Sequence, residues 1–337
     1  MSDRREFMGI LAKVTMGAAL TGADLALLST PAVATPTPAR VGATEVGQLA
    51  DLTKVLWVQE KQLGGGAVRE AVIAQLGWAR GLLEAGATDR VGRELRGVVS
   101  DLLALAGRAS SDVGLTGTAL RYLGQAVAMA QEVGEPVRAA LALGQIGRIH
   151  TRDGNSGQAR DVLNLAMVTA DRTRSSGLNA LLLTSQARAA AQARTPDQAV
   201  TYLARAEDAL SSTDTAAEPT GFDRTLFASE AGRVYTILTT QSPIYASQAI
   251  DTLTASTAQL ASGRAKRRAF ALTELATCHL HGGDSATGIH IGHQVVCMAA
   301  TIRSRKLTEH LQLLRTATRA NPSPAAKELN HRLAGMG

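Results

Sequence analysis

The sequence predicts an all-α protein built as a right-handed solenoid of helical hairpins. Ala, Leu and Val supply most of the apolar residues, which make up 45% of the chain, whereas only 3% of the residues are aromatic. Ala and Leu are strong helix formers. From about Thr44 onward, apolar residues recur with helical spacing between loops of Gly, Asp, Asn, Ser and Pro. A pattern of about forty residues then repeats along the chain.

Residues 1–40 differ from the rest and are expected to form a separate N-terminal segment. Twin arginines begin at Arg4, and a mildly apolar stretch follows that ends in an A-x-A pattern at Ala34. This arrangement resembles a twin-arginine export signal. Lys13 and Asp24 interrupt the apolar run, so a membrane-spanning length is never reached. The alternative is a linker with a short helix and an extended Pro/Thr-rich end.

Next come residues 41–337, which we expect to form one helical repeat domain. Its first part, 45–84, is predicted to be an atypical pair of helices split by three glycines at 64–66. Beyond it, small residues recur at intervals of 40: Gly107, Gly147 and Ala187. The same interval separates Ala119, Ala159 and Ala199, and also Leu123, Leu163 and Leu203. Small side chains at fixed places allow two helices of a hairpin to approach closely.

Two further copies follow with the same register. Gly232 and Ala249 are separated by 249 − 232 = 17 residues instead of 12, which indicates a five-residue insertion. Ala276 and Gly288 restore the interval of 12. One or two capping helices are predicted over 307–334, because terminal repeats of a solenoid face water. The five repeats are expected near 89–130, 137–175, 178–212, 222–260 and 266–302.

The best copy resembles the tetratricopeptide repeat. Its motif places are occupied by Leu143, Ile146, Gly147, His150, Ala159 and Leu163. Segments 40–69 and 268–284, together with the repeats, resemble the tetratricopeptide sensor region of actinobacterial helix-turn-helix transcriptional regulators. In those proteins a segment like "RREFMG" follows the DNA-binding domain. The resemblance implies a cytoplasmic regulatory module that senses a ligand. No DNA-binding domain is expected before residue 4, so transcriptional control would act through a partner or a further segment.

Arginine follows the small packing residue in four copies: Arg108, Arg148, Arg188 and Arg233. The resemblance implies that this position faces the concave groove, where stacked copies would bring the four guanidinium groups into one channel. A small residue lies four positions before each of the last three arginines, on the same helical face. These residues are Gly144, Thr184 and Ser229. We expect them to leave open volume beside the charges.

An arginine-lined groove would suit a carboxylate- or phosphate-bearing ligand, because a guanidinium group can bind such a group through two hydrogen bonds. The predicted partner is a peptide, a protein or a small acidic molecule. The alternative is that each arginine pairs with an acidic residue of its own scaffold. The acidic residues available for this are Asp101, Asp112, Asp153, Glu207 and Glu230.

His290, His293 and Cys297 share one helical face and are the candidate metal ligands of the chain. The alternative is ordinary packing, since Cys often behaves as a small hydrophobic residue. We expect no metal or other cofactor. No G-x-S-x-G, P-loop or H-E-x-x-H motif occurs, so an enzyme is not expected. An enzyme that uses the His and Cys residues remains the third interpretation.

The net charge of +6 and the isoelectric point near 9.7 would suit an anionic partner. Direct DNA binding by this chain is not expected, because stacking aromatics and a complete helix-turn-helix are lacking. We expect no membrane association, and a homodimer is compatible with the pattern. A cytoplasmic regulatory module is the favoured interpretation. The runner-up is an exported scaffold or peptide-binding protein.

Overall fold

The computed structural model describes residues 38–173, 175–211, 220–260 and 262–336. Within these ranges the chain is all-α, as the sequence predicts, and no strand longer than an isolated bridge between Arg40 and Gly86 occurs. The N-terminal segment with the predicted export signal or linker lies outside the described residues up to position 37. None of the helices in the described ranges combines the length and the apolarity needed to cross a membrane.

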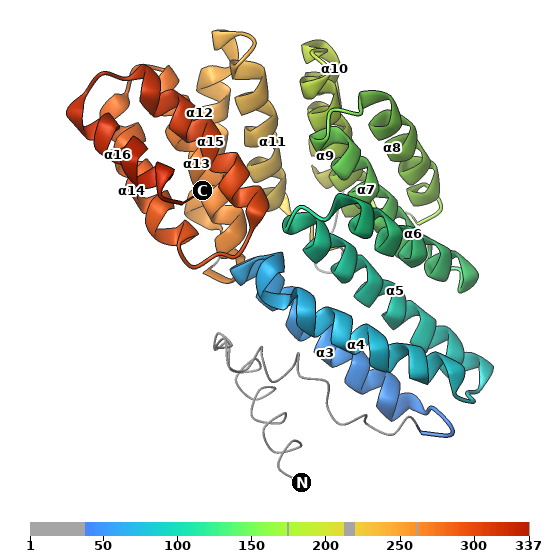
Figure 1. The fold of residues 1–337 in the computed structure, drawn as a ribbon. Coiled ribbons are helices and arrows are strands. Elements are labelled where there is room, and N and C mark those ends of the chain that lie inside the picture. The colour runs from blue at the N-terminus through green and yellow to red at the C-terminus, as the bar shows by residue number, and fades with distance from the viewer. Residues whose placement is uncertain (1–37, 174, 212–219, 261, 337) are drawn as a thin grey trace. The chain divides into compact units, whose positions relative to one another are not determined.

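The chain divides into two compact units, Met1–Arg138 and Ala139–Gly337. In the first unit, consecutive helices pack against one another (Figure 1). They are α3 (Ala43–Leu63), α4 (Gly65–Glu84), α5 (Asp89–Asp112) and α6 (Thr116–Glu132). The expectation that residues 41–337 form one continuous solenoid stays a prediction.

The second unit continues the alternation of helix and short loop (Figure 1). Its helices are α7 (Pro136–Arg152, which starts just before the boundary), α8 (Ser156–Ala170), α9 (Ser176–Gln192), α10 (Pro196–Ser211), α11 (Arg224–Thr239), α12 (Ala246–Gln259), α13 (Ala265–His281), α14 (Ser285–Ala299), α15 (Arg305–Ala320) and α16 (Pro324–Ala334). A short 3₁₀ helix, Pro243–Tyr245, lies within the predicted insertion of the fourth copy.

The small residues of the repeat are the places where two helices of a hairpin approach most closely. A Cβ atom added to Gly107 or Gly147 would lie 2.6 Å from the Cγ of Leu123 or Leu163, respectively. The same addition at Gly232 would lie 2.5 Å from Cγ of Leu253. These leucines are themselves buried. The close packing predicted for Gly107, Gly147 and Gly232 is therefore confirmed. The contact of Gly232 also agrees with the insertion predicted for the fourth copy.

The turn between the two helices of a hairpin also follows the interval of forty residues. Gly114 and Gly154 have positive φ angles of 85° and 77°, which glycine adopts without strain. In the next copy the equivalent residue is Arg194, with a φ of 60°. An arginine in this conformation is uncommon, since its Cβ atom crowds the backbone. The turn thus keeps its left-handed backbone conformation in the copy that has arginine in place of glycine.

Candidate anion-binding site

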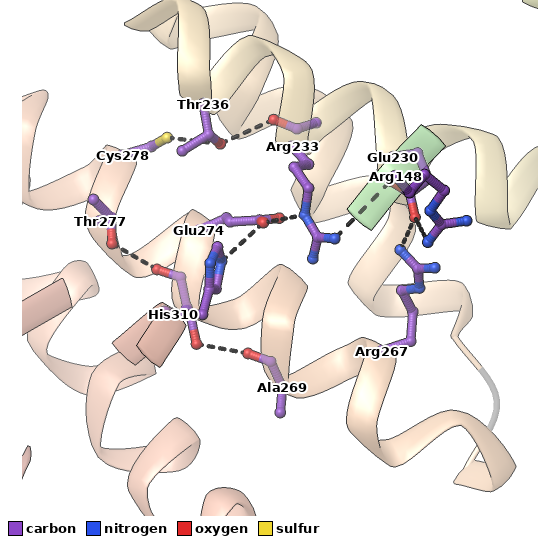
Figure 2. A network of polar contacts seen from close by, with 12 residues as sticks. Arg148, Glu230, Arg233, Thr236, Arg267, Ala269, Glu274, Thr277, Cys278 and His310 are labelled. Atoms are coloured by element: carbon purple, nitrogen blue, oxygen red, sulfur yellow. Dashed lines mark hydrogen bonds and ion pairs between the residues drawn. The ribbon is translucent and has the colours of Figure 1, made fainter. Parts of the chain in front are cut away.

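Three of the predicted arginines gather in the second unit, where they surround two buried glutamates. Arg148 comes from α7, Arg188 from α9 and Arg233 from α11, and each acts electrostatically on Glu230 of α11. Arg267, at the start of α13, joins them. Figure 2 shows Arg148, Arg233 and Arg267 directed toward the two acidic side chains. We call this set, with Glu230 and Glu274, the arginine cluster.

Glu230 lies among three of the guanidinium groups. Its Oε1 atom contacts Nη1 of Arg267 and lies 3.8 Å from Nη2 of Arg148, while its Oε2 atom lies 4.0 Å from Nη1 of Arg233. Only 7% of the side chain is exposed. Burial alone would raise the pKa of this carboxyl group, but the neighbouring arginines, Arg267 foremost, hold the pKa well below its ordinary value. Glu230 is therefore charged at neutral pH.

Glu274, on α13, is the second acidic residue and is 1% exposed. Its Oε1 atom accepts a hydrogen bond of 2.6 Å from Nε of Arg233 and lies 2.9 Å from Nε2 of His310, on α15. Burial opposes the charge, yet Arg233 and His310 lower the pKa of Glu274. The ring of Phe270 lies 5.0 Å from Cζ of Arg233, a distance suited to a cation–π contact.

Arg188 differs from the other arginines of the cluster. No carboxylate of the described residues lies within ion-pairing distance of it, and its Nε atom is shielded from water without a hydrogen-bond partner. Burial, followed by repulsion from Arg233, lowers the pKa of Arg188 to about 9, although Glu230 partly opposes this change. The position thus holds a guanidinium group whose charge is incompletely compensated.

Arg108, the fourth predicted arginine, lies in the first unit and has a partner there. Its Nε atom donates a 2.8 Å hydrogen bond to Oε2 of Glu60, whose side chain is completely buried. The guanidinium carbon also lies 5.8 Å from the centre of the Trp57 ring. The structure thus brings Arg148, Arg188 and Arg233 together within one unit, and it gives Arg108 an environment of its own.

The small residues beside the arginines do not leave the open volume that the sequence suggested. A Cβ atom on Gly144 would lie only 2.7 Å from Cδ2 of Leu182, so α9 fills the space at this glycine. Thr184 is buried, and its hydroxyl group donates to the carbonyl oxygen of Ala180 at 2.6 Å. Ser229 is also buried. These residues allow close helix packing, and the expectation of free space at Gly144 was wrong.

Only some of the acidic residues that the sequence suggested as partners of these arginines take that role. Glu230 was among them, whereas Asp101 pairs with Arg138 at 3.0 Å and Asp153 with Arg152 at 2.9 Å. Glu60 and Glu274 were not expected. A signal existed for Glu274, because it precedes the packing residue Ala276 by two positions, as Glu230 precedes Gly232. No comparable signal exists for Glu60, which comes from the atypical first pair of helices.

The candidate metal ligands are engaged in other contacts. Nδ1 of His293 lies 2.7 Å from Nη1 of Arg332, and Nε2 of His290 lies 3.0 Å from Nε2 of Gln294. Cys297 is exposed. In the part of the chain that the structure describes, no group of three or more His, Cys, Asp or Glu side chains is arranged to hold a metal ion.

A groove of about 300 Å³ lies between α8, α9 and α10, and Arg188 is not among the residues that line it. Gln186 and Ala189 of α9 contribute to its wall, and Tyr202 of α10 adds an aromatic surface. Gln186 is held in place by a 2.9 Å hydrogen bond from its amide nitrogen to Oδ1 of Asn164. No feature of the sequence predicted this groove. A comparison of the chain with models of known protein families finds no match, and a search among curated proteins finds no relative.

Proposed function

We propose that this protein is a tetratricopeptide-like helical-repeat module that binds an acidic ligand or peptide segment through the arginine cluster. The observation that carries the proposal is Arg188, a guanidinium group without an ion-pair partner among the described residues, in a cluster that contains three further arginines. A half-buried, incompletely compensated cation is costly, so an anion that binds beside it is stabilised.

The chemistry of the guanidinium group favours a carboxylate or a phosphate group as the part that is recognised. Its planar arrangement of N–H donors matches two oxygen atoms of such a group. Limited exposure to water strengthens the interaction, because the effective dielectric constant is lower than in bulk solvent. The packing of Gly147 against Leu163 and of Gly232 against Leu253 supports the repeat type on which the proposal depends.

A regulatory role follows from the resemblance to sensor regions of transcriptional regulators. In such a role the ligand would shift the helical array between two populations, for which it must have different affinities. The cluster offers a means for this, since its side chains come from four different helices, α7, α9, α11 and α13. An acidic group bound among them would favour the arrangement in which those helices are closest.

The test compares Arg188→Ala with Arg205→Ala, an exposed arginine on the neighbouring helix α10. Binding of benzoate is measured by calorimetry or, for weak binding, by nuclear magnetic resonance titration. Loss of one charge-assisted hydrogen bond is worth about 1.5–3 kcal/mol, so we expect Arg188→Ala to weaken binding roughly tenfold or more. Arg205→Ala should bind as the wild type does. Equal binding by the wild type and Arg188→Ala, or no binding by the wild type, contradicts the proposal.

A second measurement identifies the natural ligand. Native mass spectrometry of the purified protein should detect an acidic molecule that co-purifies with the wild type and Arg205→Ala. The same molecule should be absent from Arg188→Ala, provided that circular dichroism shows equal helix content in the three proteins.

A further inference from the structure

We propose that the exposed face of α8 is a self-association surface, on which a second copy of this chain packs its own α8 in the antiparallel direction. The surface consists of Asp161, Leu165, Val168 and Arg172, and we call it the α8 face. The inference goes beyond the proposed function, because it involves none of the residues of the arginine cluster.

The α8 face lies opposite the buried side of the helix. The buried residues of α8 are Ala159, Leu163, Ala166 and Ala170. Each residue of the α8 face follows one of these by two positions, which rotates it by about 200° around the helix axis. Asp171, directly after α8, keeps helical φ and ψ angles of −56° and −23°, so the helical path continues to Arg172. The α8 face is thus one exposed stripe, with a residue spacing that packed helix pairs use.

Two large apolar side chains on this stripe distinguish α8 from the equivalent helices. Leu165 and Val168, which are 53% and 65% exposed, stand two and five positions after the buried Leu163. The same places after the buried leucines of three other copies are also exposed, and they hold Gln125 and Ala128, Arg205 and Asp208, and Ala255 and Ala258. Only α8 among these helices therefore has large apolar residues on two opposite faces, which is typical of a helix that is covered on both sides.

The order of its residues makes the α8 face complementary to itself. In an antiparallel pair with a two-fold axis midway along the stripe, Leu165 of each copy lies level with Val168 of the other. Asp161 then lies level with Arg172 of the other copy, since both are about 8 Å from the centre along the helix axis. Such a symmetric contact has an apolar centre and an ion pair at each end. A parallel pair would instead place like charges opposite each other.

The existing contact of Asp161 is compatible with this pairing. Its carboxylate lies 3.7 Å from Nε of Arg160, and about three quarters of each side chain is exposed. An exposed ion pair of this kind contributes little to stability, so it can be exchanged for one with the second copy. A contact between two helices of 15 residues is small, and interfaces that bury less than about 1,200 Å² are typical of weak, transient association. We therefore expect dimers at micromolar to millimolar concentrations.

The test exchanges the charges at the two ends of the stripe. Asp161→Arg alone, or Arg172→Asp alone, brings like charges together at both ends, and each variant should dimerise about tenfold more weakly than the wild type. An equimolar mixture of the two variants should form a heterodimer about as stable as the wild-type dimer, because opposite charges then meet at both ends. Sedimentation velocity over a concentration series at low ionic strength measures this, since salt screens exposed charges.

The control is Asp251→Arg, which makes the same charge change at the equivalent exposed place of α12, two positions before a buried leucine. It should dimerise as the wild type does, and it should not rescue Arg172→Asp in a mixture. Leu165→Gln provides a second measurement, because it leaves every charge in place and changes no buried residue. It should also weaken the dimer, with a helix content equal to that of the wild type by circular dichroism.

A wild type that stays monomeric over this range overturns the inference, whatever other partner then covers the face. A mixture that associates no more strongly than its two components also overturns it. Wild-type dimers that neither the charge exchanges nor Leu165→Gln weaken have the same consequence, because the contact between the copies then lies on another surface.

Discussion

Arg108 and Arg188 occupy the same place in two repeats, yet their surroundings differ. Each follows the small packing residue of its first helix, Gly107 or Ala187, and the two positions are 80 residues apart, which is twice the repeat length. Arg108 donates to the buried Glu60 at 2.8 Å. Arg188 has no ion-pair partner among the described residues, and its pKa is lowered to about 9 by burial and by Arg233.

The difference separates two roles that look identical in the sequence. An arginine that neutralises a buried carboxylate contributes to the stability of the scaffold, since removal of one partner leaves a buried charge without compensation. Arg188, which has no such partner among the described residues, is the arginine that we propose binds a ligand. The helical register thus determines the position of each guanidinium group. Whether that group forms an ion pair depends on an acidic side chain from another helix.

The largest expected effect tests this contrast directly. Arg108→Ala removes the guanidinium group that donates to the buried Glu60 carboxylate, and we expect the free energy of unfolding of the first unit to fall by about 3 kcal/mol. Arg188→Ala should change the stability of the second unit by less than about 0.5 kcal/mol, or increase it, because no ion pair is lost. Urea denaturation, with hydrogen exchange of α5 and α9 to locate the change, measures both. Equal destabilisation by the two substitutions would remove the distinction.

The next effect tests the register on which the comparison depends. Gly147→Leu places a side chain where even a Cβ atom would lie 2.6 Å from Leu163, and we expect a loss of about 1–3 kcal/mol from overpacking. Gly157→Leu, on the partner helix α8, is the control, since a Cβ atom there meets nothing within 4 Å. Thermal denaturation of both variants gives the answer. A Gly147→Leu protein as stable as the control would show that the helices are paired differently.

The smallest effect concerns the hairpin turn that follows each arginine-bearing helix. Arg194 has a φ of 60° where the two preceding copies have Gly114 and Gly154. Arg194→Gly should raise the free energy of unfolding by about 0.5–1 kcal/mol, because strain in the left-handed region is relieved at some entropic cost. Gly154→Ala should act in the opposite direction. If both substitutions lower stability alike in urea denaturation, the turns of the two copies are not equivalent.

Much of the fold could be predicted, because helices and close contacts between them produce periodic patterns in the sequence. Gly107 and Gly147 had to be small, since each faces a leucine of the next helix, and the forty-residue interval made both visible. The same periodicity correctly indicated the insertion after Gly232. It misled at Gly144, where a small residue suggested space for a ligand although Leu182 fills it. A small residue at a given position of the sequence is compatible either with close packing or with a cavity beside it.

The sequence by itself determined that the described chain forms paired helices and that arginines recur in a common register, because both properties depend on local spacing. Tertiary structure decided which acidic residue reaches which arginine. Glu60 and Glu274 are separated from their partners Arg108 and Arg233 by 48 and 41 residues. An ion pair forms only when two atoms approach within a few ångströms. That approach depends on how the helices are packed and rotated, which residue spacing along the chain does not specify.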